Sequence, residues 1–199
     1  SSLGSMTAGL AAAGAGAAGM ALAMGAVTGV KFNANIENAT MALTTLTGSS
    51  KKAAEMIKQL QKTGQESPFN FESLQQSAKL MLAMGIEAKK VIPYMRNIGD
   101  AVAAVGGGSE QIQRVSLAIS QMSAKGKVSA EEMNQLAENG IPAWDIISKK
   151  MGKSTEELMK MGQNGKLFSS EVIPLLMEGL DNRFGGAMKR ASTTFTGML

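Results

Sequence analysis

The chain has 199 residues, of which 44% are hydrophobic and only 4% are aromatic, so aliphatic side chains must supply most of its core. The 20 Lys and Arg residues are interleaved with 16 Asp and Glu residues, a pattern that indicates no specific nucleic-acid site. Because Cys and His are both absent, zinc sites, Ser-His-Asp triads and Cys-His pairs are excluded, and we expect no enzymatic activity, metal or cofactor.

Helix-forming residues dominate the chain. Ala, Leu, Lys, Gln and Glu are frequent between residues 34 and 190, and 16 Met residues add flexible apolar side chains. Strand-forming residues are sparse. The sequence therefore predicts an all-α fold, in which an Ala/Gly-rich apolar N-terminal helix precedes a compact multi-helix module of short amphipathic helices.

The opening segment, residues 1–30, carries no charged side chain, and residues 7–30 are mostly Ala and Gly. As a helix, residues 7–30 would span about 36 Å, which exceeds the thickness of bilayer hydrocarbon. Few of their side chains are large and apolar, however, so their hydropathy is marginal for a lone membrane span. Two interpretations remain open: a helix packed within an assembly against other copies of the chain, and a helix that enters a bacterial membrane.

Small residues recur at every fourth position of this segment and would line one face of a helix. Such a series lets the backbone of a neighbouring helix come close, so it predicts helix packing. We call these residues the small-residue ridge: Gly9, Ala13, Ala17, Ala21, Gly25 and Gly29.

The next part of the chain, residues 32–64, is predicted to form two helices. Apolar residues recur at helical spacing over residues 32–43, and Gly64 closes the second helix. The pair forms a helical hairpin or linker between the N-terminal helix of residues 1–31 and the module of residues 65–199.

Within residues 65–199, amphipathic stretches alternate with helix stops and caps. Pro68 precedes one helix, and Pro93 is predicted to lie in the first turn of the next. Capping boxes at Ser129 and Ser154 predict two further helix starts. Over residues 32–199 as a whole, the pattern predicts seven to nine short helices and, without a long heptad run, no simple coiled coil.

An ordered series of short motifs covers the chain from about residue 36 onward. The motifs are 67–71 (SPFNF), 78–86 (AKLMLAMGI), 97–101 (NIGDA), 124–129 (AKGKVS), 131–136 (EEMNQL), 138–144 (ENGIPAW), 151–158 (MGKSTEEL) and 192–197 (STTFTG). In this order they resemble the N-terminal domain of tail tape measure proteins from long-tailed bacteriophages and prophages. The structural positions that we take from these motifs are Pro68, Phe69, Gly85, Gly99, Asp100, Gly126, Gly140, Pro142 and Trp144. We expect Trp144 to be a core anchor.

This resemblance implies a structural protein in the lumen of a phage tail. The tail tube protein would polymerise around it with the help of tail assembly chaperones, so that its length sets the length of the tail. Its ends would engage tail tip or baseplate proteins, and its apolar segments would meet the host membrane and assist genome ejection. The resemblance places the protein in the virion, in the host cytoplasm during assembly and at the host membrane on ejection.

The chain is long enough to be only part of a protein whose length sets the length of a tail. Even a fully helical rod of this length would reach only about 300 Å. Because the chain also begins with Ser1 rather than Met, we expect it to be a piece of a longer protein. Frequent Gly and Pro residues predict a folded module attached to the ruler rather than a straight rod.

A second function remains open from the sequence. A membrane-active effector or pore-forming protein could insert residues 7–30 and carry the helical module outside the membrane. The feature that would discriminate the two is the sequence after Leu199, since a long helical continuation would favour the tape measure and an early stop the effector.

Overall fold

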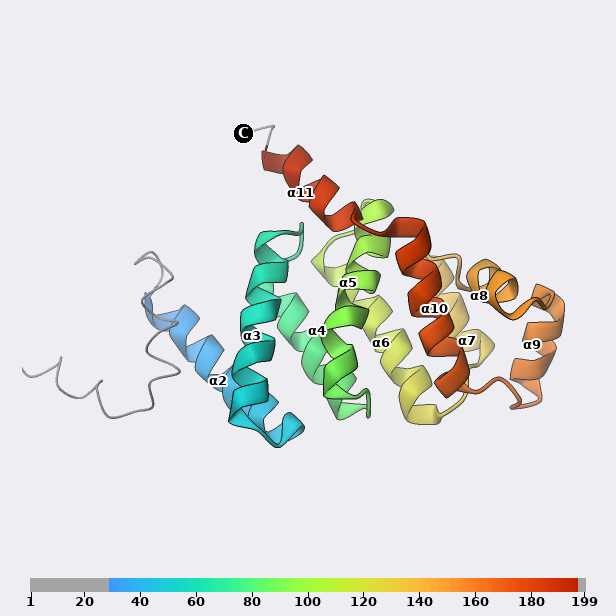
Figure 1. Cartoon of the computed structure of the whole chain (residues 1–199), viewed down its shortest axis with the longest axis horizontal. Coiled ribbons are helices and arrows are strands. Elements are labelled where there is room, and N and C mark those ends of the chain that lie inside the picture. Colours follow the sequence, from blue (N-terminus) through green and yellow to red (C-terminus); the bar gives the residue numbers. More distant parts are fainter. Residues whose placement is uncertain (1–28, 197–199) are drawn as a thin grey trace, which may run out of the picture. The chain divides into compact units, whose positions relative to one another are not determined.

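The computed structural model describes the backbone of residues 29–196 and the side chains of residues 35–194. Helices make up the regular secondary structure of these residues apart from one isolated antiparallel bridge between Lys127 and Phe168. The predicted all-α fold is therefore confirmed for the described residues. The helices, labelled in Figure 1, are α2 (Gly29–Thr47), α3 (Ser50–Gln65), α4 (Phe71–Ala83), α5 (Ala88–Ala104), α6 (Ser109–Lys125), α7 (Ala130–Glu138), α8 (Ala143–Met151), α9 (Thr155–Gln163), α10 (Ser169–Phe184) and α11 (Ala187–Thr196).

These are ten helices in the described part of the chain, one more than the largest number predicted. Three of them, α7, α8 and α9, have only 9 residues each. Gly140 and Gly152 both adopt a left-handed backbone conformation, with φ of +77° and +63°, which ends a helix. A new helix starts within three residues of each, so one stretch of chain holds three short helices.

The prediction for Pro93 is wrong, because this residue lies inside a helix rather than in its first turn. α5 begins at Ala88, and Val91 and Ile92 in its first half are buried. Burial of these two side chains offsets the one backbone hydrogen bond that a proline cannot donate.

The described residues fall into two units, one ending at Ala54 and the other beginning at Glu55. In the first unit, α2 buries Ala39 and Leu43 completely, whereas Met41 is 60% exposed. The second unit contains the helices from α4 to α11. The predicted domain boundaries after residues 31 and 64 remain predictions.

None of the helices from α2 to α11 is both long and apolar enough to cross a membrane. The segment that motivates the membrane hypothesis, residues 7–30, lies almost wholly outside the described residues. Of the small-residue ridge, only Gly29 is described, as the first residue of α2. Both interpretations of this segment therefore remain predictions.

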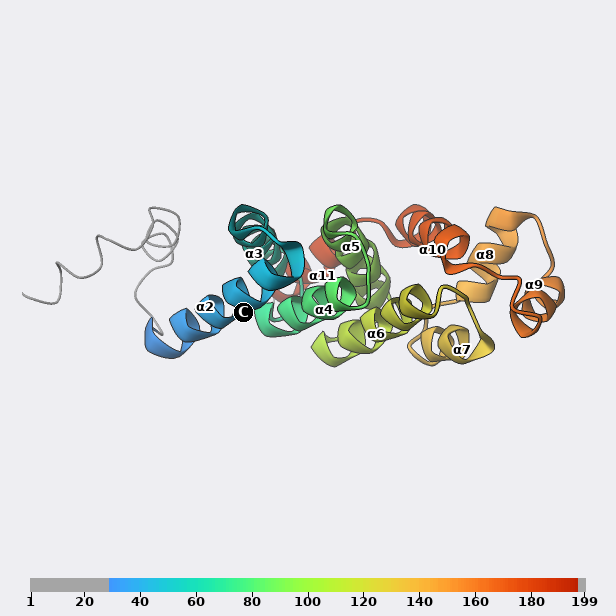
Figure 2. The same ribbon diagram turned by 90° about the horizontal axis from the view of Figure 1, so that it is seen from below.

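The second unit is built in two layers of helices. Figure 2 shows α5 and α10 in one layer and α4, α6 and α7 in the other. The helices of each layer touch one another, as α5 touches α10 and α6 touches α4 and α7, and α5 and α10 both pack on α6 across the layers. The core between them consists of aliphatic and Met side chains, as the composition predicts: Leu74, Met81, Met95, Ile98, Ile112, Ile119, Met122, Met133 and Leu136 are fully buried.

Side-chain caps start several helices, two of them at the capping boxes that the sequence predicts. The Oδ1 atom of Asn70 accepts a hydrogen bond from the backbone N–H of Ser73 at 2.8 Å, which caps α4. Both capping boxes are present, at Ser129 before α7 and at Ser154 before α9. These caps fix the ends of short helices and thereby the lengths of the connections between them.

Candidate functional site

Most of the motif residues identified in the sequence gather at junctions between helices of the second unit. In the described part of the chain, no three His, Cys, Asp or Glu side chains lie close enough together to hold a metal ion. What the structure brings together are glycines, capping side chains and one buried carboxylate that join helices far apart in the sequence. These junctions are the candidate functional features of the module.

The first junction joins α5 to the start of α11 through Asp100. This carboxylate is only 8% exposed. Its Oδ2 atom accepts a hydrogen bond from the backbone N–H of Gly186 at 3.0 Å, and its Oδ1 atom accepts one from that of Met188 at 2.8 Å. A carboxylate at a helix N-terminus is favoured by the helix dipole and satisfies free N–H groups. Asp100 therefore caps α11 from another helix.

Two other motif residues complete this junction. A Cβ atom at Gly99 would lie 2.4 Å from Sδ of Met188 and 3.3 Å from Cε2 of Phe69, so a glycine leaves the space that both side chains occupy. Phe69 is 2% exposed, whereas the neighbouring Pro68 is exposed. We call Phe69, Gly99 and Asp100 the α11 socket, since together they seat Met188 and hold the first turn of α11.

The second junction joins the end of α6 to α7. Nζ of Lys125 pairs with the carboxylates of Glu131, at 3.2 Å, and Glu132. The Glu132 side chain is completely buried. Burial raises its pKa, but hydrogen bonds from Lys125 and Ser129 outweigh that effect and hold the pKa of Glu132 below its ordinary value. Lys125, Ser129 and Glu132 form what we call the α6–α7 clasp.

The same turn also contacts the start of α10. Gly126 adopts a left-handed conformation with φ of +69° and ends α6. Its carbonyl accepts a hydrogen bond from Ser169 at 3.2 Å, while the N–H of Val128 donates to the carbonyl of Leu167 at 2.9 Å. The motif at residues 124–129 thus connects α6, α7 and the segment before α10.

The third group of motif residues lies at the turn between α7 and α8. A Cβ atom at Gly140 would lie 3.4 Å from the Val105 side chain, so Val105 packs directly against this turn. Pro142 precedes the first residue of α8. Trp144 is half-buried, and its Nε1 atom is buried without a hydrogen-bond partner. The fully buried residues here are aliphatic, Ile141 and Ile147, so Trp144 covers this part of the core rather than filling it.

Of the remaining predicted positions, Gly85 ends the turn after α4. Its φ is +92°, and the space around its Cα is open. The glycine is therefore required by the backbone conformation and not by a neighbouring side chain. The ridge residues from Gly9 to Gly25 lie outside the described part of the chain.

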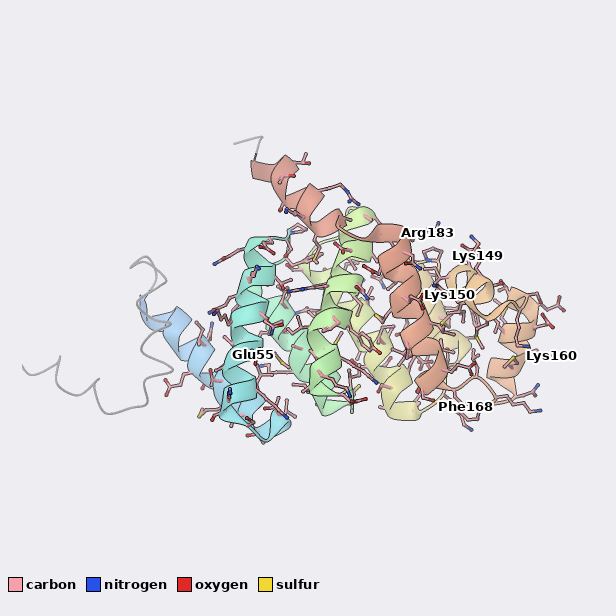
Figure 3. The ribbon with its side chains drawn as sticks, in the orientation of Figure 1. Glu55, Lys149, Lys150, Lys160, Phe168 and Arg183 are labelled. Atoms are coloured by element: carbon pink, nitrogen blue, oxygen red, sulfur yellow. The ribbon has the colours of Figure 1, made fainter. Side chains whose placement is uncertain are left out.

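Sequence reasoning missed the contact between α8 and α10. A Cβ atom at Gly179 would lie 2.1 Å from Cγ2 of Ile146, so the two helices approach closely at this glycine. Ion pairs flank the approach, with Lys150 to Glu178 at 2.8 Å and Arg183 to Asp145 at 3.0 Å. Figure 3 labels Lys150 and Arg183 along the line where α8 meets α10. The sequence signal that could have indicated this contact is Gly179 itself, an isolated glycine inside a helical pattern.

Comparisons with known proteins agree with the motif series. The family described as tape measure protein matches residues 27–199 of the chain. The chain is 29% identical over 142 residues to the Mu-like prophage FluMu protein gp42 of Haemophilus influenzae, which covers 70% of this chain and 22% of that protein. No solved structure matches the chain significantly.

Two Lactococcus phage proteins are also similar. The "Probable tape measure protein" of phage p2 is 30% identical over 140 residues, covering 69% of this chain and 14% of that protein. The "Tape measure protein" of phage F4-1 is 27% identical over 146 residues, covering 70% of this chain and 40% of that protein. The chain therefore spans less than half of the length of each of these relatives.

Proposed function

We propose, because the chain belongs to the tape measure protein family, that it is a structural component of a phage tail. The observation that carries this proposal is the extent of the family match, which includes residues 27–199 and so the whole second unit. The α11 socket and the α6–α7 clasp support a structural role, because their side chains are used to join helices. Such a component belongs in the virion.

A finer proposal concerns tail assembly. The whole protein would organise polymerisation of the tail tube and set the length of the tail, with the tail tube protein, assembly chaperones and tail tip or baseplate proteins as partners. The described residues form short helices folded on one another, so they would serve as a folded module of such a protein and not as the extended ruler itself. Other copies of the chain would pack through the small-residue ridge.

Assistance to genome ejection is a separate proposal. It depends on the uncharged residues 7–30 meeting the host membrane, and their marginal hydropathy makes this contact conditional on helix packing partners. This part of the proposed function can fail while the structural role stands.

The structural role is tested in the phage or prophage that encodes this chain. Residues 29–196 would be deleted in frame, and the particles would be imaged by electron microscopy. We expect tails to be absent or altered in length, and normal function to return when the native sequence is supplied from a plasmid. Particles with tails of normal number and length after the deletion would overturn the proposal.

A further inference from the structure

An exposed aromatic side chain lies at the isolated bridge between residues 127 and 168. Phe168 is 50% exposed and is the only aromatic residue among the large, exposed hydrophobic side chains of the described residues. Figure 3 labels it at the start of α10. Exposure of half of a phenylalanine costs free energy in the isolated chain, which makes this position a candidate contact surface.

Two lysines stand beside Phe168. The bridge is closed by hydrogen bonds from Val128 to Leu167 and from Ser169 to Gly126, so Lys127 and Phe168 form a directly opposed pair that is not itself hydrogen-bonded. The side chains of such a pair leave the same face and lie close together. Lys166 and Phe168 are exposed while Leu167 between them is fully buried, so Lys166 also lies on this face. We call Lys127, Lys166 and Phe168 the basic–aromatic tip.

The positive charge of this tip is not balanced locally. The side chain of Lys127 lies over Gly165, the residue before Lys166, with Nζ 3.1 Å from the position of a Cβ atom there. Neither lysine makes an ion pair with any described residue. Residues 124–130 and 158–170 contain no Asp or Glu, and the exposed Glu171 that follows them pairs with neither lysine. Two neighbouring cations without a counter-charge repel each other and attract a negatively charged ligand.

The backbone at the tip offers a further contact. Because Lys127 and Phe168 are a pair without mutual hydrogen bonds, the N–H and C=O of Lys127 point away from the strand that carries Phe168. These two groups make no hydrogen bond within the described part of the chain. This single residue can therefore offer one donor and one acceptor to the backbone of an extended peptide.

We propose that the basic–aromatic tip binds an extended, acidic segment of a partner protein. Carboxylates of that segment would pair with Lys127 and Lys166, an apolar side chain would cover Phe168, and its backbone would bond to the backbone of Lys127. A peptide satisfies all three features, whereas a nucleic acid would use only the charge and the aromatic face. A membrane would require a wider apolar surface than one phenylalanine. The proposal does not depend on the proposed function of the whole protein.

The test measures binding of labelled probes to the full chain by fluorescence anisotropy at low salt. The probes are a peptide in which Glu alternates with Leu, the same peptide with Lys in place of Glu, a single-stranded oligonucleotide, and vesicles of anionic lipid. We expect the acidic peptide to bind and the other three to bind at least about tenfold more weakly.

Two tip variants and one control locate the binding. Lys127→Glu combined with Lys166→Glu should weaken binding of the acidic peptide about tenfold or more, and Phe168→Ala should weaken it about fivefold. The control, Lys51→Glu with Lys52→Glu, makes the same change of charge at another exposed pair and should bind as the native chain does. Unchanged melting temperatures verify that the variants fold. If the double variant does not fold, binding is measured with Lys166→Glu alone.

Loss of acidic-peptide binding in both tip variants but not in the control supports the proposal. It is overturned if the acidic peptide does not bind, if the control loses as much affinity as the tip variants, or if the oligonucleotide or the vesicles bind more tightly through the tip.

Discussion

The α11 socket allows a quantitative prediction at Asp100. Replacing Asp100 by Ala removes both acceptors of the Gly186 and Met188 N–H groups and leaves the first turn of α11 uncapped. A hydrogen bond to a charged acceptor contributes about 1.5 kcal/mol, so the loss of two should cost about 3 kcal/mol. That cost corresponds to roughly a hundredfold increase in the equilibrium constant for the opening of α11.

Hydrogen exchange monitored by mass spectrometry measures this opening directly. In Asp100→Ala, amides of α11 should exchange about a hundred times faster than in the native chain, while the core of α6 keeps its protection. Asp100→Asn retains one acceptor oxygen and should accelerate exchange by about tenfold. Glu55→Ala, at an exposed acidic residue outside the motifs, is the matched control and should leave hydrogen exchange of α11 unchanged. Equal exchange of α11 in the native chain and in Asp100→Ala would refute the role assigned to this carboxylate.

Three further predictions concern other residues of the helix junctions. Gly99→Ala should lower the free energy of unfolding, measured by urea denaturation, by about 1 kcal/mol, since the new Cβ displaces the flexible end of Met188. In a double-mutant cycle, Met188→Ala in the same chain should remove this added cost. Glu132→Gln should lower the free energy of unfolding at pH 7 by about 2 kcal/mol. Folding lowers the pKa of Glu132 below its ordinary 4.5, so the stabilisation by its carboxylate is present above pH 4.5 and is lost as the pH falls through the pKa of the folded state. The difference in free energy of unfolding between the native chain and Glu132→Gln should therefore disappear in acid. A difference that does not change with pH would contradict the role assigned to the clasp. Trp144→Ala should lower the melting temperature, at a cost of about 2 kcal/mol for a half-buried indole, and an unchanged melting temperature would show that Trp144 does not cover the core.

Features that depend on neighbours in the sequence could be predicted. Helix stops within residues 65–199 could be predicted, because a left-handed helix end, as observed at Gly126, Gly140 and Gly152, favours glycine whatever surrounds it. The capping boxes at Ser129 and Ser154 were legible because both partners lie within four residues of each other.

Contacts between distant residues could not be predicted in this way. The motif residue Asp100 was recognised as a structural position, but its partner Met188 lies 88 residues further along the chain, and nothing in the local pattern links the two. The burial of Glu132 was likewise hidden, since an acidic residue in a first helical turn is explained equally well by the helix dipole. Pro93 was misplaced because burial of Val91 and Ile92 extends α5 upstream of a residue that ordinarily starts a helix.

The central claim is that the helix junctions built by the motif residues are what the tail requires of this module. It is tested most directly by electron microscopy of phage particles that carry Asp100→Ala, with Glu55→Ala as the control. We predict that Asp100→Ala reduces the fraction of particles with complete tails or alters tail length, while the control produces normal tails. Normal tails in Asp100→Ala, together with accelerated exchange of α11 in the purified chain, would contradict the claim.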